Sequence, residues 1–188
     1  GELTKTTNKA LIPLNGKAAV TYIVEAYAIE VPFVVTLGFL ANQVKDFLQN
    51  QYPKRNFEFV MVDKYDGPGT SLGYSMLQAK NNLQCPFIFH PCDTIPTDKI
   101  RTPSKNWIGG FLVDEKKSDL PLSHYRSHKV TNNKIVEIKD KGVPGFESIH
   151  IGFDGIKDYK DYWKTLQEIY DEDPNYKELC DVQVLDRM

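Results

Sequence analysis

Residues 32–37, Pro-Phe-Val-Val-Thr-Leu, decide the fold class of this chain. A short, continuous apolar run rich in β-branched residues predicts a strand buried on both faces, and Gly38 ends it. Similar runs follow at Phe57–Val62 and Pro86–His90. Apolar residues at helical spacing predict helices between and before these strands, over Lys17–Tyr27, Leu40–Leu48 and Ser71–Asn82. This alternation predicts βαβ crossovers and a parallel sheet, in which ligands bind beyond the carboxyl ends of the strands.

From about residue 106 the pattern becomes rich in strands divided by turn residues such as Asn132-Asn133. The predicted strands are Trp107–Val113, His124–Val130, Lys134–Lys139 and Ser148–Phe153, and a helix follows over Tyr159–Tyr170. We therefore expect one α/β domain over residues 1–188, with a first half at 1–105 and a β-rich second half at 106–188. Both ends are abrupt, so we expect the domain to be incomplete at both ends.

Composition and charge exclude several classes of protein. The chain has 188 residues, of which 41% are hydrophobic and 26% charged, which excludes a disordered chain and a collagen-like fibre. No run of apolar residues is long enough for a membrane span, and no signal-peptide pattern opens the chain. A net charge of -2 gives no argument for nucleic acid as a partner. Three cysteines, Cys85, Cys92 and Cys180, suit reduced thiols, so we expect a cytoplasmic protein.

Two segments that follow predicted strands offer groups suited to ligand binding. Asp93 comes directly after Pro86–His90, where a carboxylate is able to hold Mg²⁺, although a turn-forming or helix-capping role fits its position equally well. Gly67 and Gly69 flank a proline ahead of Thr70, and such a loop lets backbone N–H groups approach a base or a phosphate. An ordinary strand-to-helix turn also explains these glycines.

Other charged residues carry little information by themselves. Lys9, the dipeptide Asp140-Lys141 and Asp181 would each normally be solvated surface charges. The four histidines show no metal-ligand spacing and the cysteines form no CxxC pair, so zinc is not expected. No Gly-x-Ser-x-Gly motif supports a hydrolase.

Together these segments resemble the sugar-nucleotide pyrophosphorylases, which are NTP-dependent nucleotidyltransferases with a GT-A-like core. Residues 7–17, TNKALIPLNGK, are similar to the family's PK-x-L-h-P-h-x-G-K stretch, where h is hydrophobic. Residues 67–70 resemble its base-contacting glycine turn, and Cys92-Asp93-Thr94 its metal-binding Asp after a core strand. Asp140-Lys141 is similar to its EKP element, and residues 150–153 to the strand that follows. The resemblance spans about Gly1 to Trp163, with a weaker tail to Asp181.

The resemblance implies a Rossmann-like three-layer α/β/α core with a mixed, mainly parallel sheet and a β-rich acceptor-side half. It implies transfer of NMP from an NTP to a phosphorylated acceptor, a sugar 1-phosphate or phosphocholine, with release of pyrophosphate for surface polysaccharide precursors. Its implied site residues have four roles. Lys9 steadies the α-phosphate, Asp93 and Asp181 hold Mg²⁺, Gly67, Gly69 and Thr70 contact the nucleotide, and Asp140 and Lys141 bind the acceptor.

Two departures from the family pattern keep other functions open. The family's GxGxR loop, which binds the triphosphate, is not in the sequence, and we expect it upstream of Gly1; Asp140 stands where the family has Glu. One alternative is a GT-A glycosyltransferase that uses an NDP-sugar, although residues 93–95 offer one carboxylate rather than a DxD pair. The other is a non-catalytic nucleotide or sugar binder. The residues expected to line an acceptor pocket are Trp107, Tyr125, Arg126, His150 and Tyr162.

Overall fold

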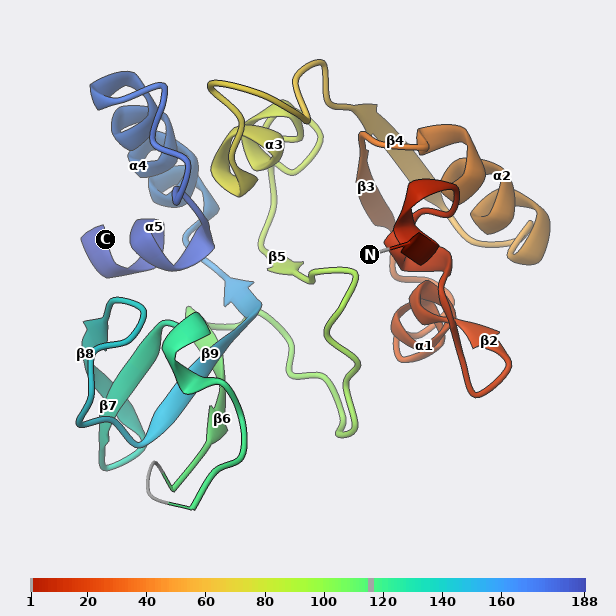
Figure 1. The fold of residues 1–188 in the computed structure, drawn as a ribbon. Coiled ribbons are helices and arrows are strands. Elements are labelled where there is room, and N and C mark those ends of the chain that lie inside the picture. Colours follow the sequence, from red (N-terminus) through yellow and green to blue (C-terminus); the bar gives the residue numbers. More distant parts are fainter. Residues whose placement is uncertain (1, 115–116) are drawn as a thin grey trace.

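The computed structural model describes residues 2–114 and 117–188, so Gly1, the start of the family resemblance, lies outside the described residues. Helices and strands are interspersed along the chain (Figure 1). The α-helices are α1 (Ala19–Glu25), α2 (Ala41–Gln51), α3 (Leu72–Gln78), α4 (Tyr159–Glu172) and α5 (Asp181–Arg187). The strands are β1 (Pro13–Leu14), β2 (Lys17–Ala18), β3 (Phe33–Leu37), β4 (Phe57–Met61), β5 (Phe87–Phe89), β6 (Trp107–Leu112), β7 (Ser127–Thr131), β8 (Lys134–Lys139) and β9 (Ser148–Ile156). In the described residues, three short 3-10 helices occupy Glu2–Lys5, Lys9–Leu11 and Leu122–His124.

The expected parallel crossover is formed by β3 and β4. These strands pair in parallel from Phe33 opposite Phe57 to Leu37 opposite Met61, with α2 as the connection between them. Val44 and Leu48 on α2 are buried in the same hydrophobic cluster as Leu37, because the apolar residues of α2 recur at helical spacing. The mixed α/β class predicted from the sequence is therefore confirmed.

The third predicted strand pairs differently from the expectation. In the described residues, β5 pairs antiparallel with β9, from Phe87 opposite Ile156, and is not hydrogen-bonded to β3. The prediction of a mainly parallel sheet is thus wrong beyond β3 and β4, since the other described pairings are antiparallel. A buried apolar run specifies a strand but not its partner.

The second half is β-rich, as expected. β9 is the central strand, because β5, β6 and β7 all pair with it. β7 and β8 form a hairpin closed by Asn132 and Asn133, which both have positive φ, 51° and 57°. Asparagine tolerates this conformation, and it matches the twist of the flanking strands. The strand predicted from His124 begins at Ser127 instead, after the 3-10 turn that ends at His124.

Helix α4 buries the face that the sequence predicts, which comprises Tyr162, Trp163, Leu166 and Ile169. This face packs in one hydrophobic cluster with Phe87 of β5 and Met76 of α3. The Trp163 ring stacks on Phe87 with centroids 5.1 Å apart, and its Nε1 donates to the Leu83 carbonyl at 2.8 Å. These contacts tie α3 and β5 to α4. None of the helices in the described ranges is both long and apolar enough to cross a membrane.

Candidate functional site

Lys9 and Asp93 meet at the end of strand β5. Lys9 opens the 3-10 helix at residues 9–11, which Asn8 caps by accepting a hydrogen bond from the Ala10 N–H at 2.9 Å. Asn8 also donates to the Phe39 carbonyl, which follows β3, at 2.6 Å. The Lys9 Nζ lies 3.0 Å from Asp93 Oδ2, and the two side chains are 59% and 64% exposed. The structure therefore brings together two residues that the sequence proposed separately.

The loop that carries Asp93 is held in place from two sides. His90 Nδ1 is hydrogen-bonded to the Tyr27 hydroxyl at 2.9 Å, and His90 Nε2 to the Thr94 carbonyl at 2.8 Å. The Thr94 hydroxyl donates to the Ile151 carbonyl of β9 at 2.8 Å. Burial lowers the pKa of His90, so this ring is neutral at pH 7 and acts as a structural link. Asp93 thus projects from a fixed loop.

The charge on Lys9 is stabilised by its surroundings. Partial burial acts to lower the pKa of Lys9, but the negative charge of a Cys92 thiolate and the hydrogen bond and charge of Asp93 outweigh it, so the pKa is raised. Burial raises the pKa of the Cys92 thiol, which leaves Asp93 as the negative partner at pH 7. Lys9 is therefore an ammonium ion at neutral pH, with more than half of its side chain open to solvent.

The glycine turn lies between β4 and α3 and has the expected backbone. Gly67 and Gly69 have φ of +90° and +79°, which side chains disfavour. The Thr70 hydroxyl donates to the Gly67 carbonyl at 2.7 Å, and Asp66 Oδ1 accepts from the Gly67 N–H at 2.9 Å. Thr70 therefore stabilises the turn, and nucleotide contact by these three predicted residues stays a prediction.

Asp140 and Lys141 belong to a network of ion pairs. The Lys141 ammonium lies 2.6 Å from Glu178 Oε2, and the Asp140 carboxylate lies 3.5 Å from Arg126 Nε. Arg126 also approaches Glu178 at 3.8 Å. The hydrogen bond and charge of Lys141 lower the pKa of Glu178. Glu178, which the sequence gave no reason to select, thus links this pair to the segment that precedes α5.

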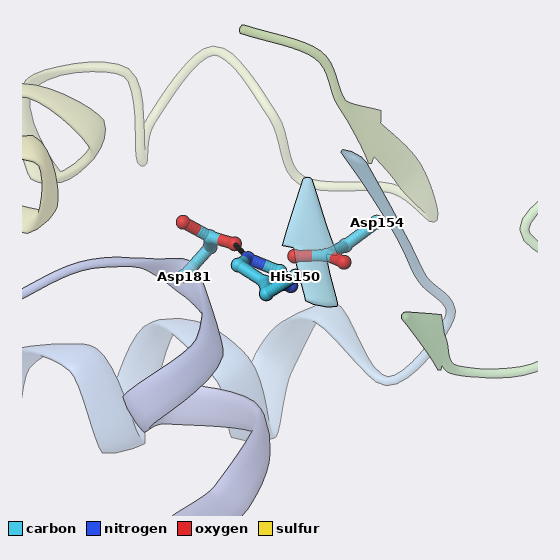
Figure 2. A group of neighbouring side chains, drawn as sticks. All are labelled: His150, Asp154 and Asp181. Atoms are coloured by element: carbon cyan, nitrogen blue, oxygen red, sulfur yellow. Dashed lines mark hydrogen bonds and ion pairs between the residues drawn. The ribbon is translucent and has the colours of Figure 1, made fainter. Parts of the chain in front are cut away.

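Asp181 lies in a different and buried cluster. It opens α5, and its Oδ2 is 2.7 Å from Nε2 of His150, with side chains 2% and 9% exposed. Figure 2 shows Asp181 from α5 converging with His150 and Asp154 from β9. Burial raises the pKa of Asp154 well above its usual value. Burial is the largest influence on Asp181 and acts in the same direction, but the hydrogen bonds with His150 and Asp154 and the charge of His150 together outweigh it, so the pKa of Asp181 is lowered.

The expected pairing of Asp93 with Asp181 has no contact to support it. Within the described ranges, no hydrogen bond or ion pair joins these two residues, whose partners are Lys9 and His150 respectively. Asp154 was missed because it follows the strand predicted to end at Phe153 and belongs to no motif, whereas β9 continues to Ile156 in the structure. Its place beside Asp181 is visible only in the folded chain, where α5 packs on β9.

The residues expected around an acceptor pocket are separated. Tyr162 is fully buried, which corrects the expectation that it lines an open pocket, and Arg126 is also buried. His150 lies in the buried cluster, and Tyr125 is half-buried at the end of a 3-10 turn. Trp107 lines a groove of about 780 Å³ that Lys9 and Asp93 do not reach. This groove is therefore not part of the site.

Comparisons with known proteins identify the fold. No family model and no curated protein matches the chain. Among solved structures, a candidate glucose-1-phosphate thymidylyltransferase from Bacillus anthracis matches with a TM-score of 0.76 at 19% identity, covering 98% of this chain and 77% of that one. The inositol-1-phosphate CTP transferase from T. maritima matches with a TM-score of 0.68 at 16% identity, covering 99% and 74%. A CTP:phosphocholine cytidylyltransferase from Streptococcus pneumoniae matches with a TM-score of 0.65 at 18% identity, covering 98% and 77%. These matches confirm the Rossmann-like nucleotidyltransferase fold that the sequence predicts.

Proposed function

We propose that this protein transfers a nucleoside monophosphate from an NTP to a phosphorylated acceptor and releases pyrophosphate. The observation that carries the proposal is the contact between Lys9 and Asp93, two residues 84 positions apart in the sequence. It places an accessible ammonium beside an accessible carboxylate at the end of a strand, on a fold shared with three proteins described as nucleotidyltransferases. The proposed setting is cytoplasmic synthesis of surface polysaccharide precursors.

Lys9 is suited to stabilise the charge that develops during phosphoryl transfer. Because its side chain is 59% exposed, an incoming phosphate is able to reach the ammonium without displacing core residues. Asn8 fixes the backbone on which Lys9 stands, so the ammonium is positioned before the substrate arrives. Preorganised charge of this kind supplies much of the acceleration in phosphoryl transfer.

The residues present fit a magnesium ion at Asp93. In the described structure, Asp93 Oδ2 faces Lys9, and no hydrogen bond engages Oδ1. An accessible carboxylate with a free oxygen suits Mg²⁺, which binds few protein groups and shares substrate phosphates. When bound, the ion would neutralise phosphate charge. Asp181 was expected to share this ion, but its carboxylate is buried against His150, so we assign only Asp93 to the substrate-associated ion.

The remaining predicted residues would bind the two substrates, the nucleotide and the acceptor. The Gly67 and Gly69 turn would present backbone N–H groups to the base, and because the Gly67 N–H donates to Asp66 Oδ1 at 2.9 Å, its use would require that hydrogen bond to break. Lys141 would hold the acceptor phosphate, with Asp140 beside it. Because Lys141 is paired with Glu178 at 2.6 Å, acceptor binding would require that ion pair to exchange for a phosphate.

The reaction balances without a redox step or an additional reactant. An oxygen of the acceptor phosphate attacks the α-phosphorus of the NTP in line with the leaving group. The bond from the α-phosphorus to the oxygen bridging to the β-phosphorus breaks as the new bond forms, and that oxygen leaves with pyrophosphate. The chain needs to supply only positioning and charge stabilisation, which Lys9 and Asp93 offer.

Pyrophosphate release by the full-length protein tests this function. The protein is incubated with Mg²⁺, one of CTP, UTP, dTTP, GTP or ATP, and a pool of sugar 1-phosphates and phosphocholine. We expect acceptor-dependent pyrophosphate with at least one nucleotide, and dividing the pool then identifies the acceptor. Release of a nucleoside diphosphate from an NDP-sugar would instead establish the glycosyltransferase alternative. The absence of both products, pyrophosphate and nucleoside diphosphate, would overturn the proposed function.

A further inference from the structure

We propose that His150, Asp154 and Asp181 form a binding site for a divalent transition-metal ion, separate from the substrate-associated magnesium at Asp93. Each residue offers one ligand atom, and these atoms lie within 4.8 Å of one another. His150 and Asp154 belong to β9 and Asp181 to the first turn of α5, so the site joins a strand to a helix (Figure 2). The inference is independent of the proposed function.

The first argument is charge. Asp154 and Asp181 are 0% and 1% exposed, and two carboxylates buried side by side require a proton or a cation between them. The guanidinium of Arg126 does not neutralise these carboxylates, because it pairs with Asp140 and Glu178. Within the described part of the chain, no lysine or arginine forms an ion pair with either buried carboxylate. A proton shared between the two carboxylates would neutralise only one of them, whereas a divalent cation would neutralise both.

The second argument is unsatisfied polar atoms. Asp154 Oδ1 accepts from the Gly109 N–H at 3.3 Å, but Oδ2 is buried with no hydrogen-bond donor. His150 Nδ1 is likewise buried without a partner. The Tyr162 hydroxyl, whose pKa is raised first by burial and further by the negative charges of Asp181 and Asp154, donates to the Met76 sulfur instead, at 3.6 Å. Buried polar groups rarely lack partners, so their occurrence within a ligand cluster points to an ion.

The donor set determines the class of metal. One imidazole and two carboxylates suit Zn²⁺, Mn²⁺ or Co²⁺, whereas Mg²⁺ prefers oxygen ligands alone and keeps several of its waters. The histidines and acidic residues show no metal spacing in the sequence because the ligands lie at positions 150, 154 and 181 and meet only after folding. The ion would fix the start of α5 against β9.

Metal binding to the full chain tests the proposal. The protein is stripped with a chelator, titrated with Zn²⁺ in a calorimeter and, separately, with Co²⁺ while its visible absorption is recorded. We expect one ion per chain and a Co²⁺ spectrum showing nitrogen and oxygen ligands. Asp154→Asn preserves the shape of the side chain and should weaken affinity at least tenfold, as should His150→Gln. The matched control Asp98→Asn, at an exposed loop position, should bind like the wild type.

Two results would overturn this site. One is the absence of stoichiometric binding by wild-type protein whose fold is verified by circular dichroism. The other is unchanged affinity in folded Asp154→Asn and His150→Gln. A rise in melting temperature on adding Zn²⁺ to the wild type provides support that depends on no variant. Because none of these readouts uses catalysis, failure here leaves the nucleotidyltransferase proposal standing, and the reverse also holds.

Discussion

The molecule holds acidic groups in two contrasting environments. Asp93 pairs with Lys9 near the surface, and both side chains are more than half exposed. Asp154 and Asp181 are almost completely buried, and Asp181 is paired with His150. Water screens the first pair, so little stability depends on it and its charges remain available to a ligand. The second group has no solvent to compensate its charge, so its members depend strongly on one another. On the two proposals above, the exposed pair would serve chemistry and the buried group would serve the fold.

The largest expected effect on stability comes from breaking the buried group. Asp181→Ala removes the partner of His150 and leaves Asp154 without its neighbour. We expect a loss of about 1–3 kcal/mol in the free energy of unfolding, the range for leaving a buried polar group without its hydrogen-bond partner. Urea unfolding measures it, with Asp98→Ala as the exposed control, expected to change by less than about 0.5 kcal/mol. Equal changes in the free energy of unfolding for Asp181→Ala and Asp98→Ala would contradict the difference between buried and exposed acidic groups.

The exposed pair should show the opposite behaviour. Asp93→Asn and Lys9→Met should each lower kcat by about 10²–10³-fold, because each removes a preorganised charge from the reacting phosphates. Neither should lower the free energy of unfolding by more than about 1 kcal/mol, since exposed ion pairs contribute little. Steady-state pyrophosphate release and urea unfolding on the same samples measure both effects. Lys5→Met, in the neighbouring 3-10 helix, is the control for Lys9 and should retain wild-type kcat.

A titration of His128 sharpens the contrast further. His128 is 0% exposed, and burial, assisted by the nearby His150, lowers its pKa to about 4. Between pH 6.5 and 4, His128 therefore binds a proton in the unfolded chain but not in the folded chain. The free energy of unfolding falls as the pH falls through this range. The slope is about 1.4 kcal/mol per pH unit for one proton. His128→Asn should lack this component when unfolding curves from pH 4 to 7 are compared. Parallel curves would show that His128 does not titrate as its burial requires.

Two glycine substitutions compare the exposed turn with the packed strand β9. At Gly67, in the exposed turn, an added Cβ meets no atom within 4 Å, so Gly67→Ala should cost only the strain of a positive φ, about 1–2 kcal/mol. At Gly155, on β9, an added Cβ would collide with the Trp107 ring, so Gly155→Ala should destabilise the protein more. Thermal unfolding of the two variants measures the difference. The reverse order would contradict the packing described for β9.

The sequence predicted features that depend on local pattern. Most helices and strands were predicted because apolar spacing is local, although Lys17–Ala18, predicted to start a helix, forms strand β2. Asn132-Asn133 was identified as a turn because its conformation is set by those two residues. Asp93 was selected because the end of a buried strand is visible in the sequence. Strand partners were not predictable in this way. The pairing of β5 with β9 joins Phe87 to Ile156, and an apolar run carries no information on which edge it will meet.

The buried cluster escaped prediction for the same reason. His150 and Asp181 are 31 positions apart and come together only because α5 packs on β9. His150 was expected in an acceptor pocket, and Asp154 was not selected, because burial of an acidic residue is a property of the folded chain. The Asp140-Lys141 pair was selected on resemblance, but its partner Glu178 lies beyond any local motif.

The most direct test of the account follows the α-phosphate of the nucleotide. Full-length protein is given Mg²⁺, the accepted NTP labelled at its α-phosphorus and the phosphorylated acceptor, and the products are separated. The account predicts that the label enters an acceptor-linked product, with one pyrophosphate released for each, and that Asp93→Asn abolishes nearly all of this transfer while Asp98→Asn does not. Label that remains in the NTP, or equal transfer by Asp93→Asn, would contradict it.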